Sequence, residues 1–144
     1  MNRNGDIIIV EDDPDDWEVL LEVFDQVLGQ NKYTNRVVII EDSTMVVDFL
    51  RESKTDPFLI ISDINMPYLN GFELRERICN DPVLNKRCQR YVFLTTSKDT
   101  EAGFMNKVHN LAVQGFFMKP VNFPDYITLI TDILGYWKKS LLPQ

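Results

Sequence analysis

Short apolar runs alternate with longer segments of helical periodicity along this chain, and this alternation restricts its fold more than any other feature. The runs are rich in Ile, Val, Leu and Phe and span four to six residues, a length typical of β-strands. Turn residues or helix-capping residues separate most of the runs from the segment that follows. The predicted strands are 6–10, 36–41, 58–61, 91–94 and 115–118.

Between these strands, apolar residues recur every three or four positions, which is the spacing of an amphipathic helix. The first helix is predicted to begin near Pro14 and to stop at Gly29, and the second to follow a cap at Asp42 or Ser43. The remaining helices are predicted over 71–79, 100–111 and 124–141. Charged residues of the third helix are expected to face mostly outward, namely Glu73, Arg75, Glu76 and Arg77.

Strands that alternate with helices predict a parallel sheet whose two faces are covered by right-handed crossovers. The predicted fold class is therefore α/β, a flavodoxin-like three-layer α/β/α sandwich. It has a five-stranded parallel sheet in the order 2-1-3-4-5 and five helices.

Composition limits the classes of function. The 144 residues, 44% of them hydrophobic, suit one domain over 1–144 with a core of about 6–142, and we expect no output domain. A net charge of −7 argues against nucleic acid as a partner, because phosphate binding requires clustered Lys and Arg. No apolar run approaches the ~20 residues of a membrane span, so a cytoplasmic protein without membrane insertion is expected.

Acidic residues follow two of the predicted strands. Glu11, Asp12 and Asp13 come directly after the first strand, and Asp63 comes two residues after the third. Ligands of open parallel sheets bind outside the carboxyl ends of the strands, and these two strands are neighbours in the order 2-1-3-4-5. Crowded carboxylates resist ionisation unless a cation lies among them, and hard oxygen ligands suit Mg²⁺. We therefore predict a Mg²⁺ site, and interpret Asp13 as a helix cap.

Two other predicted strands end in residues that suit the same crevice. Lys119 ends the fifth strand, and its ammonium group can pair with Asp63 and later with a phosphoryl oxygen. Thr95 ends the fourth strand and offers a hydroxyl donor, although a β-branched strand residue at this position is an equally good interpretation.

Four motifs occur in this order along the chain: VEDDP at 10–14, SDINMPYLNG at 62–71, LTTS at 94–97 and FFMKP at 116–120. Together they resemble the receiver domain of bacterial two-component response regulators, over the whole chain. The likeness is greatest to single-domain receivers related to the chemotaxis response regulator and to the small phytochrome-associated regulators.

This resemblance implies a stand-alone response regulator that takes a phosphoryl group from a sensor histidine kinase or a histidine phosphotransfer protein. The phosphoacceptor would be Asp63, and the protein would not be an enzyme acting on separate substrates. The implied cofactor is Mg²⁺, with Mn²⁺ as a substitute. Its implied ligands are Asp12, Asp63 and the backbone carbonyl of Asn65, and Glu11 would act on the ion mainly through water.

The resemblance also assigns the switch. Thr95 and Lys119 would contact the phosphoryl oxygens, with Thr96 as the alternative hydroxyl, and the switch aromatic would be Phe116, which lacks a hydroxyl group. The surface formed by the fourth helix, fifth strand and fifth helix would then bind a downstream protein or a second copy of the chain. Secondary positions of the site are Ser97 and Pro120.

Other functions are compatible with the same topology. A receiver-like scaffold that is never phosphorylated, and a relay or sink for phosphate, both remain open. A flavin or nucleotide enzyme is disfavoured because the loop after the first strand, EDDPDD, is acidic and lacks glycine. A phosphatase that uses Asp63 as its nucleophile is disfavoured because Asn65 cannot serve as a general acid.

Overall fold

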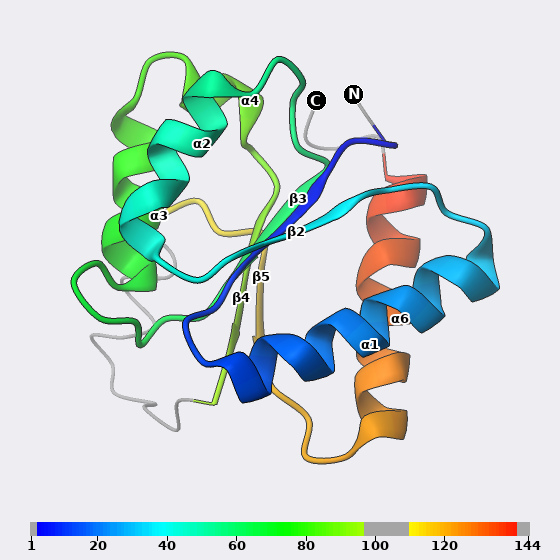
Figure 1. The fold of residues 1–144 in the computed structure, drawn as a ribbon. Helices are drawn as coiled ribbons and strands as arrows, with labels where there is room; N and C mark the ends of the chain where they lie inside the picture. Colours follow the sequence, from blue (N-terminus) through cyan, green and yellow to red (C-terminus); the bar gives the residue numbers. More distant parts are fainter. Residues whose placement is uncertain (1–2, 97–109, 141–144) are drawn as a thin grey trace.

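The computed structural model describes residues 3–96 and 110–140, which form a five-stranded sheet in the order β2-β1-β3-β4-β5 (Figure 1). All neighbouring strands are parallel, so the predicted sheet is confirmed. Each strand begins and ends within one residue of its predicted bounds. The strands are β1 (Ile7–Val10), β2 (Val37–Ile40), β3 (Leu59–Ser62), β4 (Tyr91–Thr95) and β5 (Gly115–Met118).

Helices cover both faces of this sheet, as Figure 1 shows. One face packs against α1 and α6, and the other packs against α2, α3 and α4. The predicted helix over 100–111 lies almost wholly outside the described residues. No helix within the described residues is long and apolar enough to cross a membrane. The helices are α1 (Pro14–Asn31), η1 (Ser43–Met45, a 3₁₀ turn), α2 (Val46–Glu52), α3 (Gly71–Asn80), α4 (Leu84–Arg87) and α6 (Phe123–Lys139).

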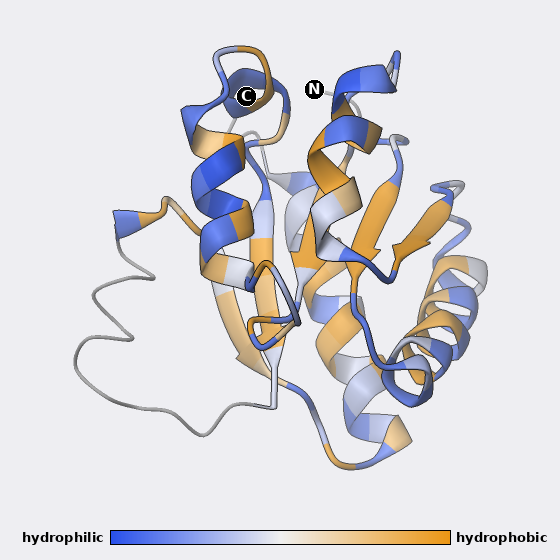
Figure 2. Cartoon of the chain, turned by 60° about the vertical axis from the view of Figure 1, so that its left-hand side comes forward, coloured by the Kyte–Doolittle hydropathy of each residue, from blue (hydrophilic) through white to orange (hydrophobic). Residues whose placement is uncertain are grey.

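The strand β1 is buried on both faces. Ile7 and Ile9 belong to the core beside α1 and α6, whereas Ile8 and Val10 belong to the core beside α2 and α3. All four are at most 2% exposed. A strand in this position must be apolar at every residue, which explains the continuous run seen in the sequence. In Figure 2 the strands are accordingly mostly hydrophobic, whereas the helices carry hydrophobic and hydrophilic faces.

The prediction that Gly29 stops α1 is wrong. The helix continues to Asn31, and Lys32 adopts the left-handed conformation with a φ of 55°. The backbone N–H of Lys32 donates to the carbonyl of Gly29 at 3.3 Å, and that of Tyr33 donates to Leu28 at 3.0 Å. These bonds satisfy the last carbonyls of the helix, so a lysine fills the capping position that glycine usually occupies.

Arg75 is also placed differently from its prediction, because it is only 3% exposed. Its guanidinium group lies over the ring of Tyr91, at 4.9 Å from the centroid. It donates hydrogen bonds to the carbonyls of Cys88 at 2.8 Å, Leu111 at 3.1 Å and Ala112 at 3.0 Å. Arg75 therefore ties α3 to the segments that precede β4 and β5.

Candidate functional site

Glu11 and Asp63 emerge side by side at the carboxyl edge of the sheet. The register of β1 and β3 pairs Val10 with Ser62, so the next residue of each strand lies beside the other. The backbone N–H of Asp63 donates to the carbonyl of Val10 at 3.1 Å, and that of Glu11 donates to Ile40 at 3.2 Å. Glu11 is 2% exposed and Asp63 is 8% exposed. The sheet therefore fixes two buried carboxylates next to each other.

The carboxylate of Asp63 has a hydrogen-bond donor on each oxygen. Oδ1 accepts from the backbone N–H of Ile64 at 2.7 Å, and Oδ2 accepts from Nζ of Lys119 at 2.9 Å. The buried side chain of Thr95 also hydrogen-bonds this carboxylate. Burial raises the pKa of Asp63, but Lys119, Ile64 and Thr95 together lower that pKa below its usual value. Asp63 is consequently ionised at neutral pH.

Lys119 brings a cation into the site from the end of β5. Its backbone N–H donates to the carbonyl of Thr95 at 2.9 Å, which continues the pairing of β4 and β5. Its ammonium group donates to Glu11, to Asp16 at 3.0 Å and to Asp63 at 2.9 Å, and its side chain is 5% exposed. Burial lowers the pKa of Lys119, but the hydrogen bonds to Asp63 and Glu11 raise it more, so the ammonium group stays charged.

Glu11 shares this single ammonium group with Asp63. Burial raises the pKa of Glu11 to about 7, an effect that Lys119 only partly offsets. The two neighbouring acids therefore differ in proton affinity, as expected when two carboxylates compete for one cation. At neutral pH Asp63 carries the negative charge, and Glu11 is the group that binds a proton most readily.

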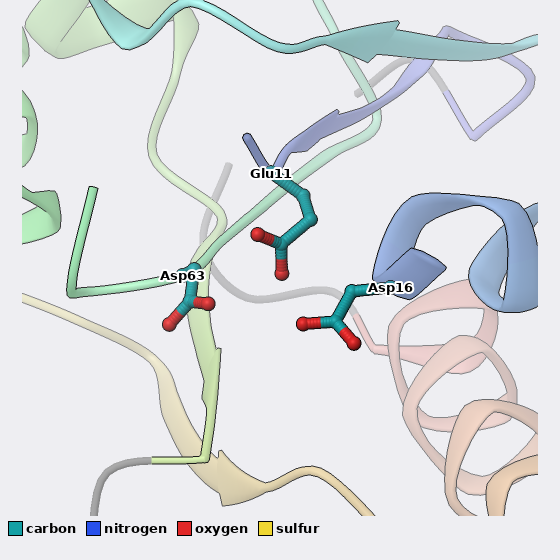
Figure 3. A group of neighbouring side chains, drawn as sticks. All are labelled: Glu11, Asp16 and Asp63. Carbon is teal, nitrogen blue, oxygen red and sulfur yellow. The ribbon is translucent and has the colours of Figure 1, made fainter. Parts of the chain in front are cut away.

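Asp16 is a member of the site that the sequence analysis did not identify. Figure 3 shows the side chains of Glu11, Asp16 and Asp63 directed toward a common space. Each offers an oxygen within 4.8 Å of the others. Asp16 lies in the first turn of α1, and that helix starts at Pro14, four residues after β1 ends. The signal in the sequence is therefore the short acidic run EDDPDD. Because α1 begins within this run, its first turn lies close to the ends of the strands.

The other predicted metal ligands lie outside this group of three carboxylates. Asp12 is half-buried and is not part of the group, and Asn65 is exposed two residues after Asp63. Asp13 caps α1, where its Oδ1 accepts from the backbone N–H of Asp15 at 3.0 Å. The roles implied for Asp12 and Asn65 stay predictions.

The predicted switch residues differ in their surroundings. Thr95 is fully buried, whereas Thr96 is exposed, so the two candidate hydroxyl groups are distinguished by burial. Phe116 is half-buried and packs against the core beside α2 and α3. Pro120 is half-buried directly after Lys119, and Ser97 lies outside the described residues.

Gly71 allows the chain to turn closely behind Asp63. It is the first residue of α3, and its N–H donates to the carbonyl of Ile64 at 2.8 Å. A Cβ at this position would overlap the carbonyl oxygen of Asp63 and come within 2.9 Å of Cα of Ile64. A capping box between Asn70 and Glu73 fixes the start of the helix. The loop after β3 is thus held by backbone contacts that any larger residue would disturb.

A groove of about 430 Å³ opens beside Lys119, between the start of α1 and the loop from β5 to α6. Asp16 and Lys119 line it on the side of the buried carboxylates. Its other walls come from Val19, Thr96, Pro120, Val121, Asn122, Phe123 and Tyr126. On this side the groove ends at Asp16 and at Lys119, whose ammonium group contacts the buried acids Glu11 and Asp63.

The donor set fits a hard divalent cation. Three carboxylate oxygens within 4.8 Å of one another, with no thiol or imidazole among them, are the ligands that Mg²⁺ and Mn²⁺ accept. The opposing feature is the ammonium group of Lys119, which already contacts all three carboxylates.

The fold and this site define a class of protein. The family described as "Response regulator receiver domain" matches residues 7–131, which is most of the chain. The protein belongs to this family.

Individual relatives are similar over nearly their full length. Response regulator Rcp1 of Synechocystis is 27% identical over 140 residues, which cover 94% of this chain and 90% of Rcp1. The crystal structure of the phosphorylated cyanobacterial phytochrome response regulator RcpA has a TM-score of 0.80 at 24% identity, covering 98% and 99% of the two chains. The Mn²⁺-bound form of Rcp1 has a TM-score of 0.77 at 24% identity, with 96% of each chain covered. These structural likenesses confirm the predicted receiver fold.

Proposed function

We propose that the protein is a response regulator in which Asp63 accepts a phosphoryl group from a phosphohistidine. The donor is a sensor histidine kinase or a histidine phosphotransfer protein. The observation that carries this proposal is the environment of Asp63, an ionised carboxylate at a strand end that contacts Lys119 at 2.9 Å and the hydroxyl of Thr95. Membership of the receiver family supports the same conclusion.

In this reaction a carboxylate oxygen of Asp63 forms a bond to phosphorus while the bond from phosphorus to the imidazole nitrogen of the donor breaks. The electron pair of that bond stays on the imidazole. Lys119 neutralises negative charge on the phosphoryl oxygens, and Thr95 donates a hydrogen bond to one of them. The backbone N–H of Ile64 holds Oδ1 of Asp63, which leaves the carboxylate in a fixed orientation.

Glu11, Asp12, Asp63 and the carbonyl of Asn65 are the groups that we propose to hold Mg²⁺. Two features support this site, the cluster of carboxylates that includes Glu11 and Asp63 and the Mn²⁺ ion bound by the similar protein Rcp1. When bound, the ion supplies positive charge beside the phosphoryl group, which reduces the repulsion between that group and the surrounding acids. Mn²⁺ is expected to substitute for it.

Phosphorylation is proposed to act on the surface of β5 and α6. Thr95 already hydrogen-bonds Asp63, so phosphorylation would shift its hydroxyl to a phosphoryl oxygen. Phe116, which lies opposite Phe93 on the neighbouring strand, would then move into the space released. The changed surface then binds a downstream protein or a second copy of the chain. Only a partner that prefers the phosphorylated form can stabilise it.

The protein is proposed to work in the cytoplasm and to catalyse only its own phosphorylation and dephosphorylation. It would bind neither nucleic acid nor membrane lipid, in keeping with its net charge of −7.

Phosphoryl incorporation tests this function directly. Purified protein is incubated with ³²P-labelled acetyl phosphate and Mg²⁺, and the label is measured on wild type, Asp63→Asn and Asp48→Asn. Asp48 is exposed on α2 and serves as a matched control with the same loss of charge. We expect label on wild type and Asp48→Asn that is lost when Mg²⁺ is chelated, and no label on Asp63→Asn.

Two results would contradict the proposal in different ways. Label on Asp63→Asn would show that another residue is the acceptor. No label on wild type, together with no Mg²⁺-dependent binding of beryllofluoride, would favour a scaffold that is never phosphorylated.

A further inference from the structure

The ammonium group of Lys119 uses its full hydrogen-bonding capacity inside the site. It has three N–H donors, and it contacts three carboxylates, those of Glu11, Asp16 and Asp63. These partners come from three different elements, the ends of β1 and β3 and the first turn of α1. The lysine is therefore held from three sides.

The three carboxylates are not equivalent. The side chains of Glu11 and Asp63 are 2% and 9% exposed and lie at the floor of the site, whereas that of Asp16 is 39% exposed. Asp16 lines the groove beside Lys119, so it lies on the solvent side of the lysine. Thr96 and Asn122, which also line this groove, are uncharged.

In the proposed function, Lys119 and a divalent ion compete for the carboxylates of Glu11 and Asp63. The proposed function places a divalent ion at these carboxylates, where Lys119 already contacts both. Two positive groups that share these acids repel each other, so the lysine must withdraw from them when the ion binds. Asp16 is the contact that such a withdrawal leaves intact, because it lies toward the groove.

We propose that Asp16 is a positioning residue that acts through Lys119: it retains the ammonium group at the rim of the site when a divalent cation engages Glu11 and Asp63. This inference rests on the proposed function. Beyond that function, the inference states that the effect of Asp16 on cation binding depends on the presence of Lys119.

A double-mutant cycle separates this role from direct coordination. Mg²⁺ affinity is measured by isothermal titration calorimetry for wild type, Asp16→Asn, Lys119→Met and the double variant. We expect Asp16→Asn to weaken Mg²⁺ binding by about fivefold when Lys119 is present, as for loss of one partly buried ion pair. In the Lys119→Met background the same change is expected to have no more effect than the control.

Asp15→Asn is the matched control. Asp15 is exposed in the same turn of α1 and loses the same charge, so it measures the general effect of charge on Mg²⁺ binding. An equal loss of affinity from Asp16→Asn in both backgrounds would overturn the inference, because it would make Asp16 a ligand of the ion. An effect of Asp16→Asn no larger than that of Asp15→Asn would overturn it as well.

A second measurement observes the ammonium group of Lys119 directly by NMR. It does not need Lys119→Met, so it applies even if that variant does not fold. Ammonium groups held by carboxylates exchange slowly with water and give ¹H–¹⁵N signals in ¹⁵N-lysine protein. We expect the Lys119 signal to persist on addition of Mg²⁺ in wild type and Asp15→Asn and to disappear in Asp16→Asn. Identical behaviour in all three proteins would contradict the inference.

Failure of the proposed function would be seen in the wild-type protein, whereas failure of the inference alone would be seen only in the variants. Wild type that neither incorporates phosphate nor binds Mg²⁺ would contradict the function and the inference together. Wild type that does both, with variants behaving like the control, would contradict the inference alone.

Discussion

The ammonium group of Lys119 lies 2.9 Å from Oδ2 of Asp63, although 56 residues separate the two in the sequence. Lys119 reaches this position because β5 is parallel to β4, and β4 is parallel to β3, so all three strands end at the same edge. Thr95, at the end of the intervening strand, hydrogen-bonds the same carboxylate. The geometry on which the proposed phosphoryl transfer to Asp63 depends is thus a property of the sheet.

Thr95→Val tests the contribution of that hydroxyl. Valine has nearly the same shape but cannot donate to Asp63 or to a phosphoryl oxygen, so we expect Mg²⁺-dependent beryllofluoride binding to weaken about tenfold. Thr95→Ser keeps the hydroxyl and is expected to bind within about threefold of wild type. Fluorescence titration with beryllofluoride measures both. Equal beryllofluoride affinity for the Val and Ser variants would show that the Thr95 hydroxyl does not contribute to binding.

The pKa of Glu11 predicts a pH dependence of stability. Burial raises this pKa from 4.5 to about 7, so between these values the folded protein binds a proton that the unfolded chain has lost. The resulting stabilisation is fully present below pH 4.5 and is lost as pH rises through about 7. In Glu11→Gln this titration is absent. The free energy of unfolding of wild type relative to Glu11→Gln should therefore fall by about 1–3 kcal/mol between pH 5 and pH 8.

Urea denaturation without divalent cations measures this difference. Glu18→Gln, an exposed change in α1, is the control and should shift by less than about 0.5 kcal/mol over the same range. A difference that is constant or grows with pH would show that Glu11 is ionised throughout.

Gly71→Ala should destabilise the protein where Gly135→Ala does not. A Cβ on Gly71 would overlap the carbonyl oxygen of Asp63, whereas one on Gly135, inside α6, would meet nothing within 4 Å. We expect a loss of about 1–3 kcal/mol in the free energy of unfolding for Gly71→Ala. Gly135→Ala should gain about 0.5–1 kcal/mol from its higher helix propensity. Thermal and urea unfolding measure both. Similar changes in the free energy of unfolding for the two variants would mean that the loop behind Asp63 accommodates a Cβ without cost.

Arg75→Gln should remove the tie between α3 and the segments before β4 and β5. Three backbone carbonyls lose a cationic donor, so the free energy of unfolding should fall by about 2–3 kcal/mol. Arg77→Gln, on the exposed side of the same helix, should change it by less than about 0.5 kcal/mol. Hydrogen exchange should also be faster at the segment before β5 in Arg75→Gln only. Equal effects of the two substitutions would contradict a structural role for Arg75.

The sequence alone determined the sheet and the convergence of Asp63, Glu11 and Lys119. Strands buried on both faces must be apolar at every position, so β1, β3 and β4 could be located without a structure. In a parallel sheet the residues after the strands share one edge, so acids and a lysine at those positions were expected to meet. The first inference uses only the residues of each strand, and the second adds the parallel arrangement that alternating strands and helices predict.

Only the tertiary structure decided which polar residues are buried and with what partners. Arg75 was predicted to face outward because it is charged, although it lies three residues before the buried Ile78 on the same face of α3. Its burial depends on carbonyls that lie elsewhere in the chain. Asp16 joins the site because α1 starts four residues after β1 ends and turns its first residues toward Lys119. Periodicity specifies the face of a helix, but the hydrogen-bond partners of a side chain are set by segments distant in sequence, and these are brought together only by the folded sheet.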